Sequence, residues 1–168
     1  MPRGKGPSAV EQTRGPDRLE ENLAVVMMRV RRSVRAALRE AAQSEGLSQN
    51  EIEVLLFLAK GRYDTARYIS RQRGMPRSLV SKSVDLLLKR GYLQASPDAR
   101  DRRVARLRLL PPAQATVDRL VLAKEAFFSQ LCRGITREEA EAFYSMVGKL
   151  TRNLNECPLA DEPEEPKG

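Results

Sequence analysis

The fold is decided by residues 74–109, which read GMPRSLVSKSVDLLLKRGYLQASPDARDRRVARLRL. Gly74 suits the end of one helix, and Pro76 suits the first position of the next, where its missing N–H costs nothing. The apolar spacing after Pro76 continues to about Arg90, just before Gly91. This part of the sequence therefore predicts a short helix, a tight turn and a longer helix.

A β-hairpin is predicted directly after the longer helix. Tyr92–Ala95 and Val104–Leu109 show the alternation typical of half-buried strands, and residues 97–103 form the loop between them. The loop is cationic, and an arginine can enter the minor groove of A·T-rich DNA, which is narrow and strongly negative. We interpret three loop residues as DNA contacts rather than as a solvated tip: Arg100, Arg102 and Arg103.

Two shorter helices are predicted before this segment. Ser48 and Glu51 have the spacing of a capping box and begin one of them. Asp64 is a candidate cap for the other, Thr65–Arg73. A helix pair followed by a basic hairpin is the outline of a winged helix-turn-helix, which places one helix in a DNA major groove. Residues 48–110 are therefore predicted to bind duplex DNA.

The helix after Pro76 has two distinct faces. Its spacing predicts an inward face formed by Leu79, Val80, Val84, Leu87 and Leu88. Its outward face carries hydrogen-bond donors and small polar groups, which suit the acceptors on base edges and the adjacent phosphates. Such residues are also common on ordinary helix surfaces, and the neighbouring hairpin favours DNA reading. The predicted DNA-binding residues of this helix are Arg77, Ser78, Ser81 and Lys82.

Further helical patterns flank this motif. One helix is expected from about Asp17 to Gly46 and another over residues 112–131, and a capping box at Thr136 and Glu139 begins a last helix. These amphipathic helices exceed what a small winged-helix core can bury, so a second copy of the chain is expected to cover them. The predicted fold is mainly α with a small β-hairpin wing, and residues 17–46 and 112–157 are its dimerisation helices.

Charge is unevenly distributed along the chain. The 168 residues include 30 Lys plus Arg and 22 Asp plus Glu, a net charge of +8. Residues 1–16 carry +2 and residues 158–168 carry −3, which leaves +9 on residues 17–157. Residues 1–16 are rich in Gly, Pro and charge, and residues 158–168 repeat Pro with Glu. Both ends are predicted to be disordered, one as a basic tail and one as an acidic tail. The basic middle favours a polyanionic partner.

The residue inventory excludes several functional classes. No apolar run approaches the length of a membrane span, and Cys132 and Cys157 suit a reducing compartment, so we expect a soluble cytoplasmic protein. There is no histidine, glycine-rich phosphate loop or carboxylate pair in an apolar surround, so an enzyme is not expected. Neither a metal nor another cofactor is predicted.

The chain resembles the MarR family of winged helix-turn-helix transcription regulators over residues 17 to about 155. Residues 75–82, MPRSLVSK, are similar to the start of the family's recognition helix, and residues 88–93, LKRGYL, to its exit. Asp101-Arg102-Arg103 is similar to the family's Asp-x-Arg wing signature. Leu110 and Ala113 stand where Thr and Gly are common, so an atypical entry into the next helix is expected.

The resemblance implies a homodimer joined through its first and last two helices, which reads a pseudo-palindrome and is usually a repressor released by a small ligand. By position, Arg103 matches the arginine inserted into the minor groove. Asp101 matches the acidic residue that helps to hold the wing, and we include it in the candidate DNA site. A small apolar or aromatic ligand would lie between the dimerisation helices and the DNA-binding part.

Two alternatives remain open at this stage. The winged helix could be an architectural or protein-interaction module that coats DNA without sequence choice, because phosphate binding needs only charge. The regulator could instead sense oxidants through Cys132 or Cys157. An inert thiol is the favoured interpretation of each, because Cys132 is expected in an apolar helical setting and Cys157 near a mobile end of the chain. The first helix also carries five arginines, which we interpret as solvated surface rather than as phosphate contacts: Arg29, Arg31, Arg32, Arg35 and Arg39.

Overall fold

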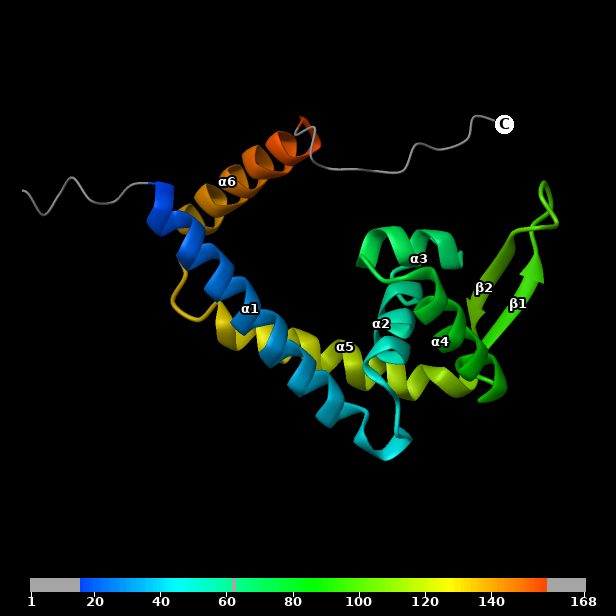
Figure 1. Ribbon diagram of the computed structural model, residues 1–168. Helices are drawn as coiled ribbons and strands as arrows, with labels where there is room; N and C mark the ends of the chain where they lie inside the picture. The colour runs from blue at the N-terminus through cyan, green and yellow to red at the C-terminus, as the bar shows by residue number, and fades with distance from the viewer. Residues whose placement is uncertain (1–15, 62, 157–168) are drawn as a thin grey trace, which may run out of the picture. The chain divides into compact units, whose positions relative to one another are not determined.

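The computed structural model describes residues 16–61 and 63–156, with side chains from residue 21 onward (Figure 1). The predicted tails, apart from Pro16, and Cys157 lie outside the described residues. The elements, in chain order, are α1 Pro16–Ala41, the 3₁₀-helix η1 Gln43–Glu45, α2 Gln49–Leu58, α3 Ala66–Arg73, α4 Arg77–Lys89, β1 Leu93–Pro97, β2 Ala105–Leu109, α5 Pro111–Leu131 and α6 Arg137–Glu156. The fold is mainly helical with a two-stranded antiparallel wing, as predicted.

The chain divides into two compact units on either side of the Phe128–Ser129 bond. In the first unit, α4 packs against α2 and α3, and the wing follows α4 (Figure 1). Side chains from five helices and both strands form one core, and Ile52, Leu55, Ile69, Leu87 and Leu120 are among its fully buried members. The wing's base closes this core through Leu93 and Leu107. The predicted helix-turn-helix is thus a packed scaffold with the hairpin fixed to it.

Two predicted capping boxes are confirmed. The Ser48 N–H donates to Glu51 Oε2 at 2.9 Å, and the Glu51 N–H donates to Ser48 Oγ at 3.3 Å. At the start of α6, the Thr136 N–H donates to Glu139 Oε2 at 2.8 Å, and the Glu139 N–H returns to Thr136 Oγ1 at 3.2 Å. Each box satisfies amides that a helix start leaves unpaired.

Three predictions about helix ends are corrected. The first helix stops at Ala41 rather than Gly46, because the chain tightens into η1 before Gly46 adopts φ 57°, a left-handed conformation that favours glycine. Asp64 does not cap α3, because Thr65 Oγ1 accepts the Tyr68 N–H at 3.4 Å instead. Pro76 is the residue before α4 rather than its first residue.

Large apolar side chains remain exposed on the outer helices. On α1 they are Val25, Val26, Met27 and Met28, whose exposed fractions lie between 48% and 64%. In the second unit, α6 has no buried residue, and Phe143 is 53% exposed. Among the described residues, no helix combines the length and apolarity that a membrane span requires.

Cys132 is an exposed free thiol in the turn that follows α5. The sequence had suggested an apolar helical setting for this residue. Its position after Leu131, the last residue of α5, corrects that interpretation.

Candidate DNA-binding site

The turn between α3 and α4 is held by its own backbone and one serine. Gly74 adopts φ 59°, and its N–H donates to the Ser70 carbonyl. The Met75 N–H also donates to that carbonyl at 3.0 Å, while Ser70 Oγ donates to the Met75 carbonyl at 2.7 Å. These bonds fix the direction in which α4 leaves α3.

All four predicted contact residues on α4 are exposed, and the structure places them on the outward side of one helix: Arg77, Ser78, Ser81 and Lys82. The inward side consists of Val80, Ser83, Val84 and Leu87. Ser83 Oγ satisfies its hydrogen bonding by donating to the Leu79 carbonyl at 2.8 Å. Their role in DNA binding stays a prediction, for which this placement is a geometric requirement.

The predicted inward position of Leu79 is wrong. Leu79 is 41% exposed, and Leu86, two turns later, is 38% exposed. The inward side centres on Val80, Ser83 and Leu87, and at 3.6 residues per turn Leu79 falls beyond its edge, on the flank opposite Ser81. Ser83 occupies the inward position that a purely apolar pattern overlooks. The outward face of α4 therefore combines polar donors with an exposed leucine.

The far end of α4 is anchored to η1 and to the start of α2. Arg90 Nη1 donates to the Glu45 carbonyl at 2.9 Å, and Arg90 Nε lies 3.3 Å from Glu51 Oε1. Glu51 is only 3% exposed and also belongs to the capping box of α2. Gly91 follows with φ 70° and turns the chain into β1. The exit of α4 is thus tied to the scaffold and to the wing.

The wing is a regular antiparallel hairpin. The register runs from Leu93 opposite Leu109 to Pro97 opposite Ala105. β1 therefore extends to Pro97, which the sequence had placed in the loop. An N–H from Asp98 to the Val104 carbonyl at 2.8 Å continues the pairing to the edge of the loop.

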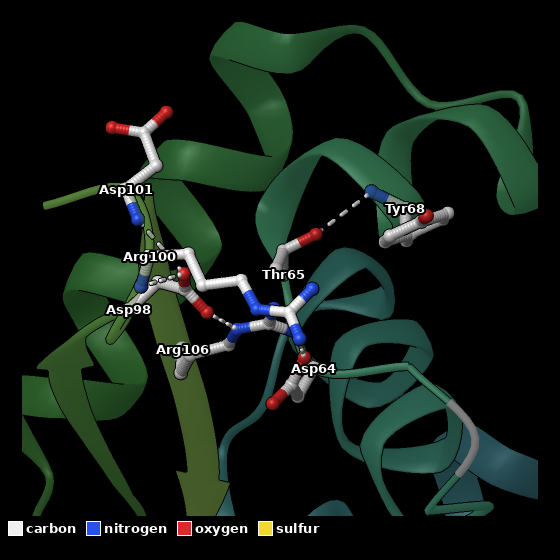
Figure 2. Close-up of polar contacts among 7 residues, drawn as sticks. All are labelled: Asp64, Thr65, Tyr68, Asp98, Arg100, Asp101 and Arg106. Atoms are coloured by element: carbon white, nitrogen blue, oxygen red, sulfur yellow. Dashed lines mark hydrogen bonds and ion pairs between the residues drawn. The ribbon is translucent and has the colours of Figure 1, made fainter. Parts of the chain in front are cut away.

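Asp98 organises the loop at the wing's tip. Its Oδ1 accepts the N–H groups of Arg100 at 2.8 Å and Asp101 at 3.0 Å (Figure 2). These two backbone bonds, followed by the Arg106 side chain, lower the Asp98 pKa from 3.8 to about 2. The carboxylate is therefore ionised at neutral pH and shapes the loop that carries the predicted arginines.

Arg106 joins the wing to the helix-turn-helix. Its Nε lies 2.6 Å from Asp98 Oδ2, and its Nη1 lies 2.6 Å from Asp64 Oδ1 (Figure 2). Both carboxylates raise the Arg106 pKa, led by Asp64. The backbone adds a bond from the Leu107 N–H to the Asp64 carbonyl at 2.7 Å. We call Asp64, Asp98 and Arg106 the wing clamp. No spacing in the sequence predicts this clamp. The acidic residue before Thr65 is the available signal, but its position favours a helix cap.

The four predicted wing residues are all exposed at the tip: Arg100, Asp101, Arg102 and Arg103. Asp101 Oδ1 accepts the Arg103 N–H at 2.9 Å, and the Asp101 carbonyl accepts the Val104 N–H at 2.9 Å. This geometry is consistent with Asp101 holding the loop, as the resemblance implies. The DNA contacts of the three arginines stay a prediction.

A cavity of about 370 Å³ lies in the first unit among α1, α2, α3 and α5. Its apolar wall includes Val34, Leu38, Leu56, Met75 and Phe128, and its charged lining is Arg31, Arg35, Arg73, Lys124 and Glu53. Arg73 Nη1 lies 3.4 Å from Glu53 Oε2, whereas Arg73 Nε is buried without a hydrogen-bond partner. The Oε1 atom of Gln49, another lining residue, also lacks a partner. The cavity lining thus combines apolar side chains with four basic residues and Glu53.

Comparisons with known proteins agree with this architecture. The MarR family model matches residues 45–104. YcgE of Bacillus subtilis (strain 168), an HTH-type transcriptional regulator, is 29% identical over 116 residues, which span 69% of this chain and 75% of the relative. The crystal structure of a MarR-family regulator from Silicibacter pomeroyi is 25% identical with a TM-score of 0.68, and the match covers 80% of this chain and 91% of that one.

BpsR of Bordetella bronchiseptica, whose DNA binding is regulated by 6-hydroxynicotinic acid, has the same fold. It is 19% identical with a TM-score of 0.61, over 77% of this chain and 98% of that chain. The family match spans the helix-turn-helix and the wing tip described above, and the structural matches extend to the outer helices. Over residues 45–104 the chain therefore matches the MarR family, and its fold is that of MarR-family helix-turn-helix transcriptional regulators.

Proposed function

We propose that the protein is a sequence-specific homodimer that represses transcription and is released from its operator by a small ligand. The observation that carries the sequence-specific part is the outward face of α4, where Arg77, Ser78, Ser81 and Lys82 lie together on a helix fixed at both ends. With α4 in the major groove, the wing arginines would reach the adjacent minor groove. The site of action is then the cytoplasm, and the partner is double-stranded DNA.

Exposed apolar surface on the outer helices supports the dimer. Val26 and Met28 of α1 and Phe143 of α6 are each more than half exposed. A second copy of the chain would remove such side chains from water, at a gain of about 25 cal/mol for each Å² buried. In this proposal, the dimerisation helices expected within residues 17–46 and 112–157 are α1, α5 and α6. Two-fold symmetry then predicts two half-sites about one helical turn apart.

The cavity among α1, α2, α3 and α5 supports the ligand part of the proposal. Its volume lies within the range of small-molecule sites, and it has four basic residues against the single Glu53. An aromatic anion would place its ring on the apolar wall and its carboxylate near Arg73. A hydroxyl group on that ring could donate to Gln49 Oε1. The ligand of BpsR, a hydroxylated aromatic acid, belongs to this chemical class.

Genomic selection tests the DNA-binding proposal. The purified protein is mixed with sheared DNA from its source at ~150 mM salt, which trims the ionic background, and the retained fragments are sequenced. A specific regulator enriches a few promoter fragments that share an inverted repeat. Uniform recovery of all fragments would instead favour an architectural module that coats DNA without sequence choice.

A paired substitution then tests the reading face, by which we mean the outward face of α4 with Arg77, Ser78, Ser81 and Lys82. Arg77→Ala with Lys82→Ala should lower operator affinity by about 100-fold or more, since each lost contact costs about 1–3 kcal/mol. Lys89→Ala is the matched control, because Lys89 is an exposed lysine at the opposite end of α4. Unchanged operator affinity in the double variant would remove α4 from the reading role.

Ligand release is tested on the operator complex with 6-hydroxynicotinic acid and related hydroxylated aromatic acids. We expect at least one of them to dissociate the complex, and Arg31→Ala to raise the concentration required by about tenfold. Arg32→Ala is the matched control, because Arg32 is a neighbouring exposed arginine that does not line this cavity. Equal responses of the two variants would argue against this cavity as the ligand site.

A further inference from the structure

We propose that Arg106 is a positioning residue for DNA binding: through the wing clamp it sets the wing's orientation relative to α4, and so decides whether the tip arginines reach the DNA. This inference rests on the proposed use of α4 and the wing. It concerns a residue that has no predicted contact with DNA itself.

The clamp connects three parts of the chain that no local sequence pattern links. Asp64 precedes α3, Asp98 begins the tip loop, and Arg106 lies on β2. The guanidinium presents Nε to one carboxylate and Nη1 to the other, each at 2.6 Å. Because the guanidinium is planar and rigid, both carboxylates must keep a fixed relation to it. The clamp therefore restrains the direction of the loop with respect to the helix-turn-helix.

A two-stranded hairpin needs such a restraint. An isolated hairpin is marginally stable, and here only Leu93 and Leu107 of the two strands are buried in the core. Beyond Leu107 the hairpin extends to the tip, where Arg103 is exposed and held to Asp101 through the backbone. Bending beyond the base would displace Arg103 from the groove, and the clamp lies between that base and the tip. A wing that is already held in the binding orientation avoids the loss of conformational entropy that a mobile wing would undergo on binding DNA.

The other contacts of the tip do not depend on Arg106. Asp98 keeps its two backbone N–H donors, and Asp101 keeps the bonds to Arg103 and Val104. The bond from the Leu107 N–H to the Asp64 carbonyl also remains and still holds the base of the wing. Loss of Arg106 should therefore leave the loop and the base in place while it frees the hairpin to bend beyond Leu107. Since the contacts of Arg106 lie on a partly exposed surface, Arg106→Ala should change the melting temperature by only a few degrees.

The test is a double-mutant cycle between Arg106 and Arg103, read out as operator affinity. In the wild-type background, Arg103→Ala should weaken binding by about tenfold. In the Arg106→Ala background, the same change should cost only about twofold, because the wing no longer delivers Arg103 to the groove. Arg106→Lys should resemble Arg106→Ala, since an ammonium lacks the planar fork that meets both carboxylates.

Arg108→Ala is the matched control. Arg108 is an exposed arginine two residues along β2, on the same side of the strand as Arg106, and it is not part of the clamp. In that background, Arg103→Ala should still cost about tenfold. Hydroxyl-radical footprints should agree: Arg106→Ala should lose minor-groove protection at the operator flanks while it keeps protection where α4 binds, and Arg108→Ala should keep both.

Additive effects of Arg103→Ala and Arg106→Ala, with an intact footprint, would overturn the positioning role while leaving the proposed function in place. If the wild-type protein prefers no fragment in the genomic selection, the proposed sequence-specific function fails. The cycle is then run on an A·T-rich duplex at low salt, where the same loss of coupling in Arg106→Ala supports the clamp and additivity overturns it.

Discussion

At the scale of single residues, Leu79 gives the reading face a group that polar donors cannot supply. An exposed leucine one turn before Lys82, on the flank of α4 opposite Ser81, is suited to contact the 5-methyl group of thymine in the major groove. We expect Leu79→Ala to weaken operator binding, with the loss coming from the methyl contact. One buried methyl is worth about 0.8 kcal/mol, which is roughly fourfold in affinity.

Deoxyuridine substitution measures this contact directly, because it removes the methyl group without changing base pairing. Scanning the operator thymines should find one position at which the wild-type protein loses about fourfold and Leu79→Ala loses nothing further. Leu86→Ala is the control, because Leu86 has a similar exposure two turns toward the end of α4. If no thymine in the operator distinguishes Leu79→Ala from the wild type, Leu79 makes no such contact.

Asp98 should confer a measurable acid sensitivity on the wing. Its folded-state pKa of about 2 is below the ordinary 3.8, so its bonds stabilise the folded loop fully above about pH 4. That contribution is lost as the pH falls through about 2. A carboxyl ¹³C NMR titration should give a midpoint near 2 for Asp98, rising toward the ordinary value in Arg106→Ala. A midpoint near 4 in the wild type would contradict the geometry of the loop.

At the scale of elements, Glu51 links the start of α2 to the end of α4. It accepts the Ser48 N–H and faces Arg90 while almost fully buried. Glu51→Ala should lower the free energy of unfolding by about 2 kcal/mol, because it removes a cap and leaves Arg90 without its carboxylate. Urea denaturation measures this change. The control is Glu40→Ala at an exposed position of α1, which should change the stability by less than about 0.5 kcal/mol.

At the scale of the whole molecule, dimerisation would place two winged helix-turn-helix parts on the two halves of an inverted repeat. Val26→Glu places a charge among exposed apolar side chains of α1 and should raise the dimer dissociation constant by at least about tenfold. Sedimentation velocity measures the change, and operator affinity should fall with it. Gln43→Glu adds the same charge in η1, outside that apolar surface, and should leave the dimer intact. A Val26→Glu protein that remains dimeric would exclude this surface.

Much of the fold was predictable because its signals are local. A capping box joins residues three apart, a left-handed glycine stops its own helix, and alternation describes a single strand, so Ser48, Gly74 and the hairpin were identified without tertiary information. The exposed face of α4 followed from helical periodicity for the same reason. The prediction that Leu79 faces inward was wrong because periodicity gives the direction of the buried face of a helix but not its width. That width depends on the elements that pack against the helix.

The sequence by itself determined the helices, turns and hairpin of the winged helix-turn-helix, because short-range sterics and hydrogen bonds decide where each of them begins and ends. The order of the charged residues along the chain and the family that the chain resembles are also properties of the sequence alone. Only the tertiary structure decided which distant charges meet. Asp64 lies 42 residues from Arg106, and Glu45 lies 45 residues from Arg90. Helical and strand periodicity cannot predict contacts between residues so far apart in the chain. The wing clamp and the basic cavity depend on how the packed helices and the hairpin are placed, and packing of the whole core sets that placement.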